Sequence, residues 1–421
     1  MAGTISAGGT AELCVAHIAA RKYHGLAVPN PLHILMIAPQ PFYEDRGTPI
    51  VLRRVLQAIS QCGYRVDLIT FSPGAAVSID GLRIFRVGKF LRIKNIPIGF
   101  SIKKLLLDMF LLPAILRRLR QQNYDCIHAV EEAAFLALLA ASVHKIPLLY
   151  DMQSSLPEHL KDCKFFSFGP IQSLLRLLEK FLIQRVDLIA CSTGLKEHVQ
   201  RIAPKKPVSE WLYPTVDVML PGVASGGPLL DLNIPTGGYV ILYTGNFAAY
   251  QGVDRLVKAI PLVLEEIPKA IFVFVGSKTG EDLPGLDTCR QSEFAVRVVP
   301  RLPQEQMAGF LSLANVVVSP RLPIGNLPLK VFDYMASGKP IVATDSKAHR
   351  TVLHDDSAVL VEHKPEAFAA AIVKLYKNPA LAERLARTAH QFALEDLGWD
   401  TFIGQVRKLY TEVRNAARPA R

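Results

Sequence analysis

The stretch SPRLPIGNLPLKVFDYMASGKPIVAT, residues 319–344, decides the fold of this 421-residue chain. It joins two apolar segments through a loop rich in proline and a helical pattern that ends at Gly338. A strand, a loop, a helix and a second strand in this order form a βαβ unit with parallel strands. Because such sheets bind ligands beyond the carboxyl ends of their strands, this loop is a candidate site.

The same alternation extends outward through both halves of the chain. It predicts an α/β protein with two doubly wound, Rossmann-like domains that face a cleft. A stretch rich in Pro, Gly and Ser, residues 221–238, separates the halves and is interpreted as a hinge. The expected strands are 33–38, 64–71, 124–130, 146–151, 186–192, 239–245, 270–276, 296–300, 315–320, 340–344 and 358–361.

Composition and charge limit the classes of function. Half of the residues are hydrophobic and 20% are charged, so the chain can bury two cores and is not disordered. Its 48 Lys and Arg against 37 Asp and Glu give a net charge of +11, which favours an anionic partner. Nucleic acid is the least expected of these, because the sequence has no motif for it. The six scattered cysteines without a CxxC motif favour a reduced, cytoplasmic compartment.

One loop of the first half has the pattern of an anion site. Gly47 and Thr48 precede Pro49 and a helical pattern, so free backbone N–H groups could point at a phosphate. An ordinary helix cap by Thr48 is the simpler interpretation. Neither GxGxxG nor GxxxxGK[ST] occurs, so neither a dinucleotide fingerprint nor a P-loop is predicted.

Several motifs resemble those of the retaining GT-B glycosyltransferases of family 4 (group 1). DYMASGKPIVA (333–343) resembles the family's EAMAxGxPVVA block, and YTGNFAAYQGVDRLVKAIPLVLEEIPKAIFVFVGS (243–277) resembles its GRLxxxKG segment. VDLIACSTGLKEHV (186–199) is similar to ADxVIAxS, and YPTVDV (213–218) stands where PNGVD does. The motifs occur in the family's order, so the resemblance covers most of the chain.

This resemblance implies an enzyme that moves a sugar from a nucleotide-diphosphate sugar to an acceptor, with retention and without a metal ion or other cofactor. It also implies a domain organisation. Residues 1–30 are expected to be a flexible tail, 31–222 the acceptor-binding domain, 223–398 the nucleotide-sugar-binding domain, and 399–421 a C-terminal helix with a basic tail.

The resemblance assigns candidate site residues, and the chain departs from the family pattern at several of them. Asp333 stands where a Glu holds the nucleotide ribose, but Gly325, followed by Asn326, replaces the Glu that contacts the sugar. Asn246 and Gln251 replace the family's phosphate-binding Arg and Lys. The expected donor-binding residues are Gly47, Thr48, Gly245, Asn246, Gln251, Arg321, Gly325, Leu329, Lys330 and Asp333.

Arg321 and Lys330 are the candidates to replace the missing cations, because a guanidinium or an ammonium beside the donor loop could neutralise a diphosphate. They could equally be solvated surface charges. The expected catalytic residues are Glu131, His128 and Asn326. A packed residue at the end of a strand is the simpler interpretation of His128, and helix capping explains Glu131 equally well.

A basic, apolar region in the first half predicts contact with a membrane. Eight cations in residues 89–120 surround the run LLLDMFLLPAILRRL, and residues 170–185 carry apolar side chains at helical spacing. A buried helix with solvated charges is the alternative, but the pattern suits an interfacial helix at anionic lipid. With no signal peptide pattern and no apolar run of about 18–20 residues, we expect a cytoplasmic protein, peripheral on the inner face of a membrane, with a lipid-linked or membrane-borne acceptor.

Two alternatives keep the same fold. The missing cations and the missing Glu are compatible with a catalytically degenerate, sugar-nucleotide-binding partner of another glycosyltransferase. A sugar-nucleotide epimerase shares the two-domain architecture. Uracil, guanine and adenine nucleotides all stay open as donors.

Overall fold

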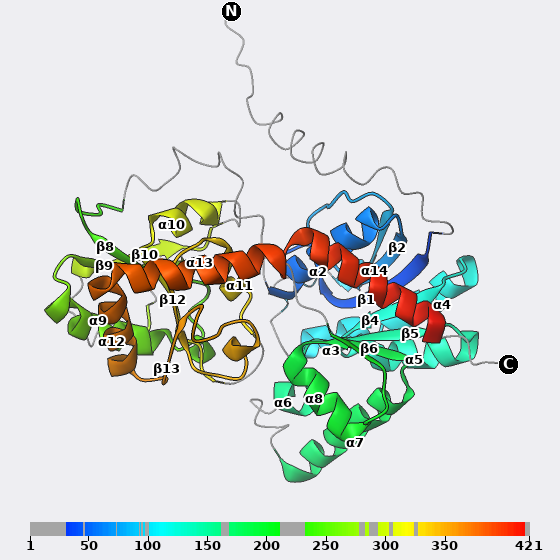
Figure 1. Cartoon of the computed structure of the whole chain (residues 1–421). Helices are drawn as coiled ribbons and strands as arrows, with labels where there is room; N and C mark the ends of the chain where they lie inside the picture. The colour runs from blue at the N-terminus through cyan, green and yellow to red at the C-terminus, as the bar shows by residue number, and fades with distance from the viewer. Residues whose placement is uncertain are drawn as a thin grey trace, which may run out of the picture. The chain divides into compact units, whose positions relative to one another are not determined.

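The computed structural model of the chain forms two compact units (Figure 1). The first holds the chain from its first strand to Cys191, with Val199–Glu210 and the chain from Ile403 on; the second holds Ser192–His198 and the remaining chain up to Phe402. The structure describes residues 31–44, 47–72, 74–91, 93, 96, 101–160, 168–210, 232–277, 283–285, 294–302, 306–323 and 327–416. The expected tail 1–30, most of the hinge 221–238 and most of the basic tail lie outside them.

The first unit is built on a parallel sheet in the order β3-β2-β1-β4-β5-β6-β7. Its strands are β1 (His33–Pro41), β2 (Arg65–Phe71), β3 (Leu82–Val87), β4 (Cys126–Val130), β5 (Leu148–Met152), β6 (Leu188–Cys191) and β7 (Val208–Glu210). The five inner strands were predicted, because strands that are covered on both faces have continuous apolar sequences. The edge strands β3 and β7 were missed, because most of their residues are partly exposed and polar residues interrupt them.

The helices of the first unit include one with a proline in its first turn. They are α2 (Gly47–Gln61), α3 (Ile102–Asp108), α4 (Leu111–Gln121), α5 (Ala133–His144), α6 (Leu156–Leu160), α7 (Gly169–Arg185) and α8 (Thr193–Ile202), with the 3-10 turn η1 (Lys89–Leu91). Pro113 lies in the first turn of α4, where backbone N–H groups have no acceptor within the helix, so the proline costs no hydrogen bond.

The C-terminal helix α14 (Trp399–Ala416) completes the core of the first unit. Tyr410 is fully buried, its hydroxyl lies 2.7 Å from His128 Nδ1, and its ring packs edge-on against Tyr64. Figure 1 shows this helix, in red, beside α2 and the sheet of the first unit. The chain therefore returns to its first unit after passing through the second.

A buried ion cluster ties α4 to the sheet of the first unit. The Asp67 carboxylate accepts hydrogen bonds from Arg83 at 2.7 and 2.9 Å and from Arg118 at 2.6 Å. Burial alone would raise the pKa of Asp67, but hydrogen bonds from Tyr124, Arg83 and Arg118 lower it. Arg118 was expected among the cations of the basic region 89–120; its guanidinium instead belongs to this cluster.

The second unit has a parallel sheet in the order β10-β9-β8-β11-β12-β13, and all six of its strands were predicted. They are β8 (Tyr239–Thr244), β9 (Ala270–Ser277), β10 (Val296–Pro300), β11 (Val316–Ser319), β12 (Ile341–Thr344) and β13 (Val359–Val361). The helices are α9 (Val253–Glu266), α10 (Met307–Leu313), α11 (Lys330–Ala336), α12 (Pro365–Lys377) and α13 (Pro379–Glu395). Two buried apolar clusters form its core.

The strand order locates one ligand-binding edge in each unit. The order reverses between β1 and β4 in the first sheet and between β8 and β11 in the second. At such a switch point the loops that follow the two central strands diverge, which leaves space for a ligand at the carboxyl ends of the strands. The loops after β1, β4, β8 and β11 are therefore the places where function is expected.

Helix α3 carries a carboxyl group whose charge opposes folding. Burial, and the proximity of Glu132, raise the pKa of Asp108 to about 7, although Lys104 acts in the opposite direction. Because this folded-state pKa exceeds the unfolded value of about 3.9, the folded chain binds more protons between these limits. The free energy of unfolding therefore falls as the pH rises from about 4 to 7.

Asp108→Asn removes this titration. Compared with the unchanged protein, we expect the variant to have the same thermal stability at pH 4 and a higher melting temperature at pH 8. Asp80→Asn, which removes one exposed carboxylate, is the matched control for the change in net charge. A pH-independent effect of Asp108→Asn would contradict the argument.

Candidate functional site

The carboxyl ends of β8 and β11 bring together residues that are far apart in the sequence. Gly245 follows β8 with a φ of 121°, and a Cβ atom there would lie 2.8 Å from Lys330 Nζ. Gln251, in the 3-10 helix η3 (Ala249–Gln251), accepts a hydrogen bond of 3.2 Å from the same ammonium. Three of the expected donor-binding residues, Gly245, Gln251 and Lys330, thus form one cluster.

The ammonium group of Lys330 lies against an aromatic ring and pairs with no carboxylate of the described residues. Its Nζ atom is 3.8 Å from the centroid of the Tyr243 ring. Burial, and secondarily the charge of Arg321, lower the pKa of Lys330 well below its usual range. Among the residues that the structure describes, no Asp or Glu forms an ion pair with it. A cation held in this way is costly unless an anion or a polar group compensates for the lost water.

Arg321 places a second cation near the first. It lies in the loop that follows β11, and its guanidinium is 5.0 Å from the centroid of the Tyr250 ring. Burial lowers the pKa of Arg321, although Tyr250 and Tyr243 partly oppose this. Its buried Nε atom has no hydrogen-bond partner in the described part of the chain. The loop is fixed from behind, because the Leu322 N–H donates to the Tyr250 carbonyl at 3.0 Å.

The remaining expected residues of the second unit shape this edge. Asn246 is exposed; its side-chain oxygen accepts from the Ala248 N–H at 3.1 Å, and its carbonyl accepts from the Tyr243 hydroxyl at 2.7 Å. Leu329 is the N-cap residue of α11, and Asp333 lies in the first turn of that helix. Gly325 and Asn326 lie outside the described residues.

A histidine that the sequence did not indicate supports the loop of Arg321. His349 is buried, with Nε2 at 2.9 Å from Ser319 Oγ and Nδ1 at 3.0 Å from Ser346 Oγ. Burial lowers the pKa of His349 to about 4, and Arg321 and Lys330 contribute, so the ring is neutral at pH 7. No motif marks this residue, because Ser319 and His349 meet only through the pairing of β11 with β12.

In the first unit, Glu131 follows β4 at the switch point. Its φ of 51° is unusual for a residue with a side chain, and its N–H donates to the Asp151 carbonyl at 3.0 Å. The carboxylate accepts hydrogen bonds of 3.1 and 3.2 Å from the Ser154 hydroxyl. Burial, with Glu132 and Asp151 nearby, raises the pKa of Glu131 well above its usual range. This environment favours the neutral form of the carboxyl group over the charged form.

The other expected residues of the first unit have simpler environments. His128 is fully buried within β4, 2.7 Å from the Tyr410 hydroxyl and 3.6 Å from Asp151 Oδ2. It is packed into the core, as the simpler interpretation of the sequence held. Helix α2 begins at Gly47, two residues before the predicted first helical residue Pro49, so Thr48 lies inside the helix and not at the cap position that the sequence predicted.

Two doubly wound units with a switch point in each sheet are the architecture of the GT-B fold. Residues 46–218 match Glycosyltransferase Family 4, and residues 238–378 match Glycosyl transferases group 1. The two matches cover both halves of the chain in the order that the resemblance predicted. The chain belongs to the group 1, family 4 glycosyltransferases.

Relatives of known name are distant. The chain is 30% identical to a D-inositol 3-phosphate glycosyltransferase of Thermomonospora curvata over 44% of this chain and 45% of that protein, so the match spans less than half of the relative. It is 25% identical to the enzyme of the same name from Nocardiopsis dassonvillei over 86% of this chain and 89% of that one.

Solved structures share the fold across both units. Sucrose-phosphate synthase from Thermosynechococcus elongatus has a TM-score of 0.72 at 19% identity and covers 91% of this chain and 100% of its own. The Anabaena protein HepE, in complex with UDP-glucose, has a TM-score of 0.66 at 15% identity and covers 90% of this chain and 99% of its own. These likenesses confirm the predicted GT-B fold.

Proposed function

We propose that this glycosyltransferase moves a sugar from a nucleotide-diphosphate sugar, held by the second unit, to a lipid-linked or membrane-borne acceptor, held by the first, with retention of configuration and without a metal ion. The observation that carries the donor half of this proposal is the pair of cations, Lys330 and Arg321, at the carboxyl ends of β8 and β11. Neither has a carboxylate partner among the described residues. A diphosphate would supply the missing negative charge through charge-assisted hydrogen bonds.

The position of Lys330 suggests that α11 supplies the positive charge that the family's Lys supplies from position 251. The resemblance places a phosphate-binding Lys at position 251, where this chain has Gln. The Gln251 side chain accepts a hydrogen bond from the ammonium group of Lys330. Lys330, in α11, therefore brings a positive charge next to position 251, where the family has a Lys. We propose that Lys330 and Arg321 bind the diphosphate in place of the family's Lys and Arg.

Asp333 is proposed to bind the ribose of the donor. It lies three residues after Lys330 in the first turn of α11, so a nucleotide whose diphosphate reaches Lys330 would have its ribose near this carboxylate. The complex of HepE with UDP-glucose is a related structure with a donor of this class. It supports the proposal by analogy of fold.

The acceptor is proposed to bind at the switch point of the first unit. Glu131 follows β4 there, and its raised pKa suits a group that donates a hydrogen bond to an acceptor oxygen. With retention, the departing phosphate oxygen can take the proton of the acceptor hydroxyl, so this Glu need not be the base. His128 has no exposed surface, and we give it a packing role; Asn326 stays a prediction.

A degenerate partner subunit is the second candidate function. Asn246 and Gln251, where the family carries cations, favour it. Such a protein would bind the nucleotide sugar without turning it over. Binding and turnover must therefore be measured separately.

The first prediction concerns the cations. A thermal-shift screen of UDP, GDP and ADP identifies the nucleotide, and calorimetry then compares this diphosphate with its nucleoside. Lys330→Ala and Arg321→Ala should each weaken diphosphate binding by about 1.5–3 kcal/mol, or roughly 10- to 150-fold, and nucleoside binding much less.

The double variant Lys330→Gln with Gln251→Lys should recover part of the lost diphosphate affinity, because it places an ammonium group at the same site but on residue 251. Lys339→Ala is the matched control. Lys339 lies just ahead of β12 and so at the amino ends of the strands, away from the candidate site, where its ammonium group donates to the Ser312 carbonyl. Equal losses for diphosphate and nucleoside would show that these cations do not contact phosphate.

The second prediction concerns Asp333. Asp333→Asn keeps the shape of the side chain and removes its charge, so it should weaken binding of nucleoside and nucleoside diphosphate by the same factor, because both contain the ribose. Circular dichroism serves as the control for folding. Calorimetry that shows an unchanged affinity for both ligands would exclude the ribose role.

The third prediction tests catalysis itself. Purified protein with the identified nucleotide sugar should release the nucleoside diphosphate, slowly by hydrolysis and faster with a membrane extract that contains acceptor. Glu131→Ala, which removes the hydrogen-bond donor, should retain donor affinity and lower turnover, whereas Glu131→Gln, whose amide still donates, should keep more of it. Donor binding without any turnover would favour the partner subunit, and a changed sugar still attached to its nucleotide, seen by NMR, would favour an epimerase.

A further inference from the structure

Helix α7 of the first unit buries polar side chains on one face and exposes leucines on the opposite face. Glu179 is 2% exposed and accepts a hydrogen bond of 2.8 Å from the Leu156 N–H, and Gln172 is buried on the same face. On the opposite face, Leu174 is 54% exposed and Leu177 63%. A helix that packed only inward would bury its leucines and expose its glutamate. The outer stripe of α7 therefore requires a different explanation.

The exposed apolar stripe of α7 continues to Phe181, where a guanidinium group packs against the aromatic ring. Phe181 is 45% exposed, and the guanidinium of Arg185 lies 3.9 Å from the centroid of its ring. Arg176 and Lys180 are exposed on the flanks of the helix. Long basic side chains beside apolar ones are typical of helices that lie at a membrane surface, where the apolar groups insert and the charges stay in water.

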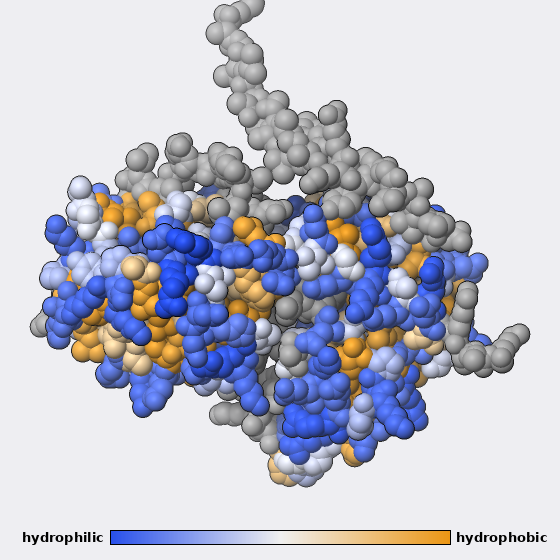
Figure 2. Space-filling model, in the orientation of Figure 1, coloured by the Kyte–Doolittle hydropathy of each residue, from blue (hydrophilic) through white to orange (hydrophobic). Residues whose placement is uncertain are grey.

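Three neighbouring helices expose apolar side chains as well. Helix α3 contacts α4, α4 contacts α5, and α5 contacts α7. Met109, directly after α3, is 67% exposed, and Val143 of α5 is 76% exposed. Most of the exposed large apolar side chains among the described residues lie between residues 90 and 181. At the lower end of the first unit, Figure 2 shows apolar residues among hydrophilic ones.

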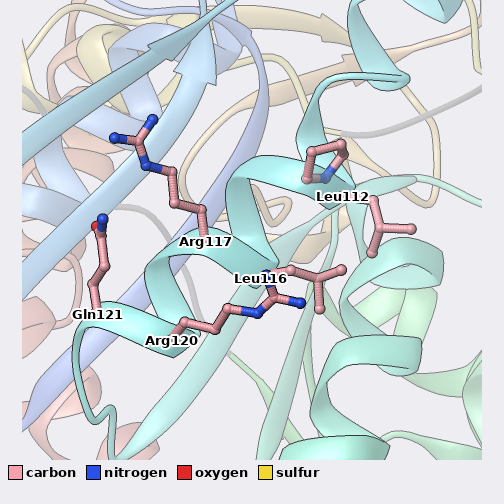
Figure 3. Close-up of a pocket in the computed structure, with 6 residues that line it drawn as sticks. Leu112, Leu116, Arg117, Arg120 and Gln121 are labelled. Atoms are coloured by element: carbon pink, nitrogen blue, oxygen red, sulfur yellow. The ribbon is translucent and has the colours of Figure 1, made fainter.

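Helix α4 adds a hollow with basic side chains along it. The hollow has a volume of about 440 Å³ and is lined by Leu112 and Leu116, with Arg117 and Arg120, among others. Figure 3 shows these side chains along α4. Residues four apart lie on one side of a helix, so Leu112, Leu116 and Arg120 form a single stripe.

The charge of these four helices has one sign at the surface. Their sequences contain only two carboxylates, Asp108 and Glu179, and neither is exposed. Of their eight Lys and Arg residues, Arg118 belongs to the buried cluster of Asp67, and Lys104 pairs with Glu132. The exposed charge that remains is positive.

We propose that the outer surface of α3, α4, α5 and α7, here called the docking surface, binds an anionic lipid bilayer. Charge complementarity and exposed Leu, Met and Phe fit such a surface. A protein partner fits it less well, because the energetic centres of protein interfaces favour Trp and Tyr, which are absent from these four helices. No helix among the described residues is long and apolar enough to cross a bilayer. The inference adds to the proposed function, because it would bring a membrane-borne acceptor to the first unit.

Two variants separate the two sources of binding. Arg117→Gln with Arg120→Gln removes charge, and Leu174→Gln with Leu177→Gln and Phe181→Gln removes apolar area. Both sets lie at the surface, so folding should be kept, and circular dichroism checks this. The matched controls lie in the second unit: Lys258→Gln with Lys269→Gln for charge, and Leu313→Gln with Leu394→Gln for apolar area.

The measurement is flotation of the whole chain with vesicles of phosphatidylcholine, with and without phosphatidylglycerol, at low and high salt. We expect binding only with the anionic lipid, and weaker binding at high salt. The charge variant should lower the partition coefficient at low salt about 30-fold, about fivefold for each cation. The apolar variant should lose the part of the binding that resists salt, and the controls should bind like the unchanged protein.

Absence of binding to anionic vesicles at low salt would overturn the proposal, as would equal losses in the control variants. A dimer that the apolar variant dissociates, together with no vesicle binding, would instead identify the docking surface as a protein interface. Nucleotide binding by the same variants should be unchanged. This readout separates failure of the docking surface from failure of the proposed function.

Discussion

The hydrogen bond from the Thr244 N–H to the Tyr334 hydroxyl, 2.9 Å long, holds the candidate donor site together. Tyr334 is fully buried in α11, about one turn after Lys330, and Thr244 is the last residue of β8, so this contact fixes α11 against the end of β8. Lys330 begins the same helix. Its ammonium group can therefore lie beside Gly245 and Gln251 only while α11 is held at the end of β8.

The two units place opposite chemistry at equivalent positions of their sheets. In the second, the switch point carries cations whose pKa values burial lowers, which favours an anionic ligand. In the first, it carries Glu131, whose pKa burial raises, which favours a neutral ligand with hydroxyl groups. In both units, burial disfavours the charged form of the side chain. A buried cation is stabilised by an anionic ligand, whereas a buried carboxyl group in its neutral form can hydrogen-bond a neutral ligand. A phosphorylated donor and a hydroxyl-bearing acceptor fit these two environments.

The fold could be predicted from the sequence because most of its strands are buried on both faces and have continuous apolar sequences. The edge strands β3 and β7 lack this signal, because polar residues interrupt them. For the site, the resemblance indicated Lys330 and Gln251 separately. Their contact, like that of Ser319 with His349, depends on which strands pair, which local sequence does not encode. Arg118 was misassigned for the same reason.

The proposals assign two physically different roles to the positive side chains behind the net charge of +11. Lys330 and Arg321 lie in a partly dehydrated site, where salt screens little and a bound diphosphate contacts them directly. Arg117, Arg120 and Arg176 lie in water, where their attraction to an anionic surface falls within a Debye length of about 8 Å at physiological salt. Ionic strength should then separate the two, since raising it weakens attachment to lipid far more than it weakens binding of the donor. On these proposals, buried cations select a ligand and exposed cations bring the first unit to a surface, and burial of the α7 leucines in lipid adds a contribution that salt does not weaken.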